Sequence, residues 1–168
     1  LPGIRINSSN VVLRGLAVGN FPADGISVAG DDVTITTMNV GVGADGSTDT
    51  GNGAGGIVVT TGDRLTIGGA DPLDRNIIGN SASIGLTVTD SDDSVIRGNY
   101  IGVQVDGVTA APNWAGIRVS SGANVQIGGA GATHGNVISA NTGQGITLDA
   151  SVDGAQVRGN LIGVGADG

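Results

Sequence analysis

The sequence predicts an all-β fold in which the chain winds into a solenoid of about six coils, each built from three short strands. Three observations favour this class: a recurring phrase, two further apolar stretches after each copy of it, and a composition rich in turn-forming residues. The phrase reads Gly-apolar-any-apolar and begins at Gly3, Gly25, Gly56, Gly85, Gly116 and Gly145. Repeats with a period of roughly 20 to 50 residues are typical of stacked solenoids rather than of globular folds.

The phrase itself predicts the first strand of each coil. Its two apolar residues are two positions apart, so they point to the same buried face of a strand. Equivalent residues of successive coils should stack about 4.8 Å apart and fill the interior. The first such column is expected to contain Ile4, Ile26, Ile57, Leu86, Ile117 and Ile146.

Two more strands are predicted in each coil. The second follows a turn rich in Asp, Gly, Ser and Asn, and its apolar positions are Val11/Leu13, Val33/Ile35, Leu65/Ile67, Ser94/Ile96, Val125/Ile127 and Ala155/Val157. The third carries Val40/Val42, Ile78, Ile101/Val103, Ile138 and Ile162/Val164. Three strands and three turns make one triangular coil, in which every strand pairs in parallel with its equivalent in the next coil.

The coils alternate between two kinds. Gly25, Gly85 and Gly145 are spaced by 60 residues, and so are Gly56 and Gly116. The longer coils carry a Gly-Val…Asp-Gly tail at 41–46, 102–107 and 163–168, whereas the shorter ones carry Ile-Gly-Gly-Ala at 67–70 and 127–130. We interpret residues 1–168 as one solenoid domain. Neither end shows an obvious cap, so we expect an excerpt of a longer solenoid, or ends that stack on a neighbour.

Composition and charge narrow the function. Glycine accounts for 33 of the 168 residues, all 15 acidic residues are Asp and all seven basic ones are Arg, which favours turns over helices. A net charge of −8 disfavours nucleic acids and anionic lipid surfaces as partners. No apolar run is long enough to insert into a membrane. The absence of cysteine leaves the compartment open.

Several phrases resemble a known family. They are the stretches 75–80 (RNIIGN), 95–102 (VIRGNYIG) and 136–141 (NVISAN). They are similar to the right-handed parallel β-helix repeats of the pectate-lyase-like superfamily, as found in large secreted or surface bacterial proteins, and the similarity covers essentially the whole chain. It implies a right-handed parallel β-helix located outside the cell or on its surface. The superfamily includes lyases, hydrolases, esterases, epimerases and passive stalks, so the resemblance selects no activity.

Four asparagines occupy equivalent positions, one residue before the apolar residue of the third strand: Asn76, Asn99, Asn136 and Asn160. The resemblance implies that they form a ladder inside the coils, hydrogen-bonded to the backbone and to one another. A carboxamide suits this role because it donates and accepts at once. A ligand-binding role is the alternative, and the structural interpretation is favoured.

The aspartates suggest a second pattern. Counted from the opening glycines, Asp32, Asp63, Asp93 and Asp153 should form a column at the first turn, with Ala123 in the fifth coil. A hard cation such as Ca²⁺ takes oxygen ligands and could use Asp90, Asp92 and Asp93. Aspartate is also a common turn former whose side chain caps nearby N–H groups. The second explanation is favoured, so no cofactor is predicted unless Ca²⁺ binds at these three residues.

Acid–base catalysis on a polysaccharide needs two carboxylates about 5–9.5 Å apart. A stacked pair such as Asp63 and Asp93 would satisfy the distance, but the chain has no Glu, no Lys and a single histidine, His134. No local set of Asp, Arg and His departs from the repeat, so no catalytic residue is assigned. The resemblance to lyases makes Arg97 and Arg158 the nearest candidates for a base, although the repeat offset alone explains them.

Carbohydrate binding has its own candidate residues, which are Trp114, Tyr100, Arg97 and Arg158. Sugar platforms use large amphipathic rings, and Trp114 and Tyr100 are the only two in the chain. Packing of the Trp114 loop onto the coil is the alternative.

The leading hypothesis is therefore a non-catalytic extracellular module that acts as a stalk, spacer or adhesin surface. The alternative is a carbohydrate-active enzyme, either a polysaccharide lyase or a glycoside hydrolase, or a carbohydrate-binding module. Its partner would be a polysaccharide or cell-surface glycan lying along one face of the helix.

Overall fold

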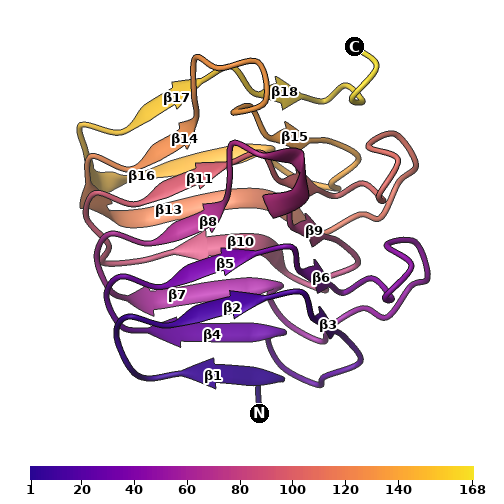
Figure 1. Cartoon of the computed structure of the whole chain (residues 1–168), viewed down its shortest axis with the longest axis horizontal. Helices are drawn as coiled ribbons and strands as arrows, with labels where there is room; N and C mark the ends of the chain where they lie inside the picture. Colours follow the sequence, from indigo (N-terminus) through magenta and orange to yellow (C-terminus); the bar gives the residue numbers. More distant parts are fainter.

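The computed structural model describes residues 1–168, and the chain winds through six stacked coils (Figure 1). Each coil contributes one strand to each of three parallel six-stranded sheets. Sheet A contains β1 (Ile4–Ile6), β4 (Ile26–Ala29), β7 (Ile57–Thr61), β10 (Ile84–Val88), β13 (Ala115–Ala123) and β16 (Ile146–Asp153). Sheet B contains β2 (Val12–Arg14), β5 (Thr34–Thr36), β8 (Thr66–Gly68), β11 (Val95–Arg97), β14 (Gln126–Gly128) and β17 (Gln156–Arg158). Sheet C contains β3 (Ala17–Val18), β6 (Asn39–Val40), β9 (Ile77–Ile78), β12 (Tyr100–Ile101), β15 (Val137–Ile138) and β18 (Leu161–Ile162).

The predicted all-β solenoid of six three-stranded coils is confirmed. The only helix is a single 3-10 turn, η1 (Pro72–Asp74). The first predicted column is in register through all six coils of sheet A, from Ile4 to Ile146. A second column lies on the inner face of sheet B and contains Leu13, Ile35, Ile67, Ile96, Ile127 and Val157. Stacked Ile and Val side chains fill the interior, as expected for parallel sheets.

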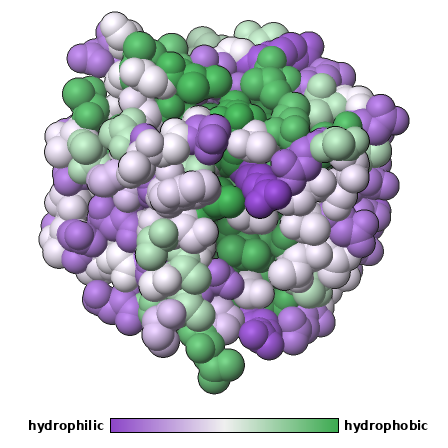
Figure 2. Space-filling model, turned by 180° about the vertical axis from the view of Figure 1, so that it is seen from behind, coloured by the Kyte–Doolittle hydropathy of each residue, from purple (hydrophilic) through white to green (hydrophobic).

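Exposure of the apolar column residues rises sharply in the last coil. Ile117 is 1% exposed and Val119 is fully buried in the fifth coil, whereas Leu148 and Ile162 of the sixth are 41% and 49% exposed. Apolar patches accordingly gather toward the top of the face seen in Figure 2, the end that this coil forms.

The glycine that opens each phrase is needed for close packing between coils. A Cβ on Gly25 would lie 2.9 Å from the carbonyl oxygen of Gly56, and one on Gly56 would lie 2.5 Å from that of Gly85. Real Cβ atoms do not approach backbone oxygens so closely, so glycine stacks on glycine from coil to coil. These positions do not have a positive φ. Glycine is therefore required at these positions because there is no space for a side chain, and not because of the backbone conformation.

The predicted aspartate column is wrong at Asp32 and Asp93, whose preceding residues occupy it instead, whereas Asp63, Ala123 and Asp153 lie in it as predicted. Asp63 N–H donates to Asp31 Oδ1 at 3.0 Å, and Asp92 N–H donates to Asp63 Oδ1 at 2.9 Å. The residues Asp31, Asp63 and Asp92 therefore share one column. At Asp32 the cause is an irregularity in sheet A, where Val28 and Ala29 pair with Val59 and Thr61. The extra residue in β7 places Asp63 in line with Asp31 rather than Asp32.

The next residue in each coil, at this same corner between sheets A and B, forms a neighbouring column with left-handed backbone. Its members Asn10, Asp32, Arg64, Asp93 and Asn124 have φ between 53° and 61°. Asn and Asp tolerate this region well, which accounts for their abundance at the turn.

Loops flank sheet C on both sides. After sheet C, the Gly-Val…Asp-Gly tails fold back, with the bridges Val42–Asp49 and Val103–Ala110 at their bases. Before sheet C, the shorter coils carry the insertions 69–75, which contains η1, and 129–135. Between them lies a small cluster on the outer face of sheet C, formed by Val42, Ile77, Tyr100, Val103, Ala111 and Val137.

In the first two tails the aspartate organises its loop. Asp106 Oδ1 accepts the N–H groups of Val108 and Thr109 at 2.9 and 2.8 Å, and Thr109 Oγ1 donates to Asp106 Oδ2. These hydrogen bonds, led by the one from the Thr109 hydroxyl, lower the pKa of Asp106. In the preceding tail the backbone N–H groups of Thr48 and Ser47 lower the pKa of Asp45 in the same way.

Acid should loosen the 104–109 loop through Asp106. Because the pKa is lower in the folded state, the carboxylate stabilises the loop above its unfolded pKa of about 3.9, and this contribution is lost as the pH falls through the folded value. We expect the protection factors of the Val108 and Thr109 amides, which correct for the pH dependence of intrinsic exchange, to fall below about pH 4, while the amides of β10 stay protected. In Asp106→Ala the exchange should be fast already at pH 7. Identical pH profiles for the two proteins would contradict the assignment.

Candidate functional site

The four predicted asparagines lie at the corner between sheets B and C and form a continuous ladder. Asn76 Nδ2 donates to Asn99 Oδ1 at 2.9 Å, and the same bond joins Asn99 to Asn136 at 2.9 Å and Asn136 to Asn160 at 2.8 Å. Each Nδ2 also donates to a carbonyl oxygen of the preceding coil, those of Ile35, Ile67, Ile96 and Ile127. Asn76, Asn99 and Asn136 are fully buried. The ladder therefore joins the coils, and the amides of its three buried members are fully engaged.

A second ladder, which the sequence interpretation missed, lies at the corner between sheets C and A. Asn113 Nδ2 donates to Asn141 Oδ1 at 3.0 Å and to the carbonyl oxygen of Ile78 at 3.1 Å. Asn52 Nδ2 donates to the carbonyl oxygen of Val18, in the preceding coil, at 3.4 Å. The available signal was an asparagine after the third strand in coils 2, 4 and 5, but loops of different length obscure the spacing.

Ser81 interrupts this second ladder. Ser81 lies between Asn52 and Asn113. Its side chain bonds to neither asparagine, and its buried Oγ has no hydrogen-bond partner. Its own N–H does donate to Asn113 Oδ1 at 3.0 Å, so the backbone is in register. The gap arises because the serine side chain is too short to reach the coil below.

Ser81→Asn is expected to stabilise the protein. The new carboxamide would reach the coil below and remove an orphaned buried hydroxyl, for a gain of about 1 kcal/mol. For a domain of this size that corresponds to a rise in Tm of roughly 2–4 °C in thermal melts. Ser81→Ala is the control, since it removes the hydroxyl without completing the ladder and should give a smaller change. A lower Tm in Ser81→Asn than in the wild type would contradict the interpretation that Ser81 leaves the second ladder incomplete.

The candidate Ca²⁺ ligands at the corner between sheets A and B each bond to a different partner. Asp92 Oδ1 accepts the N–H of Ala123 at 2.7 Å, Asp93 Oδ1 accepts Asn124 Nδ2 at 3.0 Å, and Asp90 Oδ2 lies 3.5 Å from Thr61 Oγ1. Nowhere in the chain do three Asp or His side chains lie close enough to hold a metal ion. The three candidate Ca²⁺ ligands Asp90, Asp92 and Asp93 are thus not brought together.

The same corner holds one strong ion pair. Arg64 binds Asp32 through Nε and an Nη, both at 2.8 Å. The bidentate hydrogen bonds lower the pKa of Asp32 and raise that of Arg64. Both groups stay ionised at neutral pH, so neither is suited to proton transfer.

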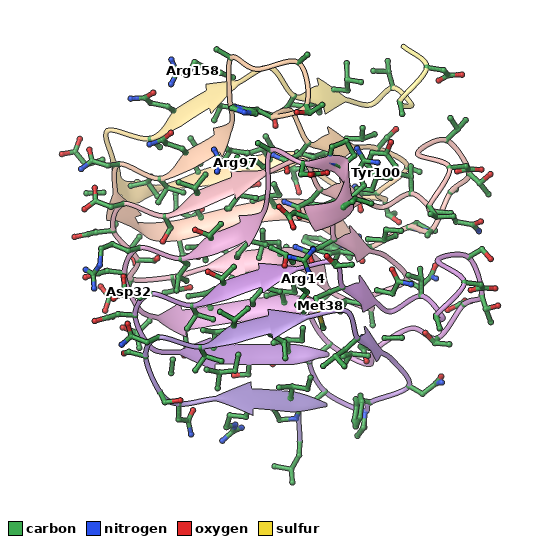
Figure 3. The ribbon with its side chains drawn as sticks, viewed as in Figure 1. Arg14, Asp32, Met38, Arg97, Tyr100 and Arg158 are labelled. Carbon is green, nitrogen blue, oxygen red and sulfur yellow. The ribbon has the colours of Figure 1, made fainter.

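The four candidate carbohydrate-binding residues lie on different faces. Arg97 and Arg158 belong to one outward column of sheet B, separated by Gly128 (Figure 3). Neither forms an ion pair with an aspartate. Tyr100 lies on the outer face of sheet C and is 9% exposed. Trp114 precedes the first strand residue of β13 in sheet A.

Trp114 has the most accessible aromatic ring of the chain. It is 55% exposed although its backbone is fixed, because its N–H donates to Ser83 and its carbonyl oxygen accepts from Gly143. The ring borders a hollow of about 180 Å³ on the outer face of sheet A. The polar groups of this hollow are Gln144, Thr147 and the ion pair Arg118–Asp149, whose N–O distance is 2.7 Å.

Residues 2–166 match a family model described as a right-handed β-helix region. The chain belongs to this family. No curated protein and no solved structure matches it. The family defines the architecture and the hand of the solenoid, both of which the sequence had predicted.

In this right-handed β-helix most buried polar chemistry is directed along the axis, from coil to coil. The two ladders and the aspartates at the corner between sheets A and B engage their amides and carboxylates in hydrogen bonds between coils. The structure contains no helical element that is long and apolar enough to cross a membrane.

Proposed function

We propose that this β-helix is a rigid, non-catalytic segment of an extracellular or cell-surface protein, acting as a stalk, spacer or adhesin surface. The observation that carries the proposal is that the buried polar side chains hydrogen-bond to neighbouring coils. The buried asparagines Asn76, Asn99 and Asn136 are all engaged by neighbouring coils, and the stacked aspartates accept backbone N–H groups of the coil above. Such continuous bonding resists bending and leaves few functional groups for chemistry.

The arrangement of charges supports the same proposal. General acid–base catalysis requires a proton donor and an acceptor facing one substrate position. Arg97 and Arg158 lie on sheet B, whereas the stacked carboxylates Asp31, Asp63 and Asp92 lie at the corner between sheets A and B and are held by backbone N–H groups. A net charge of −8 keeps such a segment dispersed in solution, and the absence of cysteine is compatible with a location outside the cell.

A product assay on neutral and acidic polysaccharides, with and without Ca²⁺, tests the passive role. We expect no products above background. Asp63 is the most informative residue to change, because it is the middle member of the only stacked carboxylate column. Turnover by the wild type that disappears in folded Asp63→Asn would overturn the proposal.

Carbohydrate binding without turnover is a second candidate function, favoured by the exposed ring of Trp114. A sugar can stack on such a ring while hydroxyl groups bond the neighbouring Gln144 and Thr147. Trp114→Ala should then remove binding in a glycan screen, whereas Val108→Ala, which truncates another half-exposed apolar side chain, should not. Equal binding by both variants would exclude Trp114 as the platform.

A further inference from the structure

Two residues over sheet C depart from the repeat and touch each other. Arg75 is replaced by Gly135 in the equivalent position 60 residues later. Tyr100 occupies an outward position of sheet C where the other coils have Ala17, Asn39, Ile77, Val137 and Leu161. The guanidinium carbon of Arg75 lies 3.9 Å from the centre of the Tyr100 ring. Duplication explains neither residue, so their contact calls for another reason.

Arg75 has no acidic partner. Arg14, Arg64 and Arg118 pair with Asp74, Asp32 and Asp149, respectively. Arg75 donates only its Nε–H, to the carbonyl oxygen of Gly98 at 3.1 Å. This bond and the ring beneath fix the guanidinium plane and leave the terminal amino groups free. A fixed planar fork of this kind is suited to binding an oxyanion.

Arg75 and Tyr100 line a hollow of about 280 Å³, called here the sheet C hollow. Its lining includes Arg75, Tyr100, Thr133, Val137, Leu161 and Ala166, and contains none of the aspartates. Gly135 and Gly159 also line it, and a Cβ at either position would clash with a backbone carbonyl oxygen of a neighbouring coil, so neither admits a side chain. The hollow therefore combines a single cation with walls that are polar in part and apolar along Val137, Leu161 and Ala166.

We propose that the sheet C hollow binds a small organic monocarboxylate with an apolar body. The carboxylate would accept two hydrogen bonds from the terminal amino groups of Arg75. Its aromatic or branched aliphatic body would cover Val137, Leu161 and Ala166. A monoanion is indicated because the lining holds one cation and no second positive group. This inference is independent of the stalk proposal, since a passive segment can still carry a ligand site.

Benzoate is a suitable probe, followed by ¹H–¹⁵N NMR of the full chain. The Arg75 Nε–H is hydrogen-bonded and should give its own signal. We expect benzoate to shift that signal and the amides of Thr133 and Gly135 saturably, with a dissociation constant on the order of 1–10 mM. Benzyl alcohol, which lacks the charge, and sulfate, which lacks the apolar body, should shift them at least about fivefold less at equal concentration.

Arg75→Gly is the matched variant, because the duplicated unit has glycine at this position and folds. It should abolish the benzoate shifts at Thr133 and Gly135, whereas Arg158→Gln, which changes an exposed arginine elsewhere, should retain them. Equal shifts in Arg75→Gly, or no saturation in the wild type, would overturn the site. Sulfate shifts as large as those of benzoate would overturn the apolar part of the proposal.

Discussion

Ile117→Asp is expected to prevent cooperative folding of the β-helix. Ile117 is 1% exposed and lies between Leu86 and Ile146 in the first column of sheet A. The substitution loses about 1.5–3 kcal/mol of apolar burial and adds several kcal/mol for desolvating an unpaired carboxylate. Net stabilities of domains are about 5–15 kcal/mol, so this loss removes most of the margin. Far-UV circular dichroism should show no cooperative melting transition.

Thr87→Asp is the matched control. Thr87 lies on the adjacent strand β10, points outward and is paired in register with Arg118. A carboxylate there stays solvated and lies beside a positive charge, so the Tm should change by no more than about 2 °C. If Ile117→Asp melted like Thr87→Asp, the buried column could not be the basis of stability.

Asn99→Asp should have the second largest effect, because it places a charge in the middle of the first ladder. Asn99 Nδ2 now donates to Ile67 O at 2.9 Å, Arg97 O at 3.1 Å and Asn136 Oδ1 at 2.9 Å. An ionised carboxylate would direct an oxygen at these three acceptors. Leaving such a buried group unsatisfied and charged costs about 3–5 kcal/mol, measurable by denaturant unfolding at pH 7.

The pH dependence separates this effect from a loss of packing. Burial among acceptors raises the folded pKa of the introduced carboxyl above its unfolded value of about 3.9. The destabilisation is therefore full at neutral pH and is relieved as the pH falls through the raised pKa. The control is Asn160→Asp at the partly exposed end of the ladder, which should cost less at every pH. A pH-independent loss in Asn99→Asp would refute the electrostatic explanation.

The sequence was sufficient to predict the fold because the apolar columns repeat with little interruption. The register of Ile26, Ile57 and Leu86 follows directly from the spacing of their glycines, since each coil returns the phrase to the same corner. The first asparagine ladder was equally regular. In both cases one residue type recurs at one structural position. The repeats of a single chain can therefore be compared with one another, as homologous sequences would be.

The remaining features depend on local geometry that spacing does not reveal. The irregularity beside Ala29 adds one residue to β7, which moved Asp63 into the column of Asp31 rather than Asp32. The second ladder is obscured by loops of unequal length. The contact between Arg75 and Tyr100 joins residues on different elements, and neither has a periodic partner.

The first ladder also has a direction. Every asparagine donates to a carbonyl of the preceding coil, as Asn76 does to Ile35, and accepts the backbone N–H of the ladder position below, as from Met38 at 2.9 Å. All its amide dipoles therefore point the same way, and aligned hydrogen bonds polarise one another. A coil added at the carboxyl-terminal end finds a carbonyl acceptor and an N–H donor already in place beneath it, and its second Nδ2 hydrogen is left to bond the asparagine of the next coil.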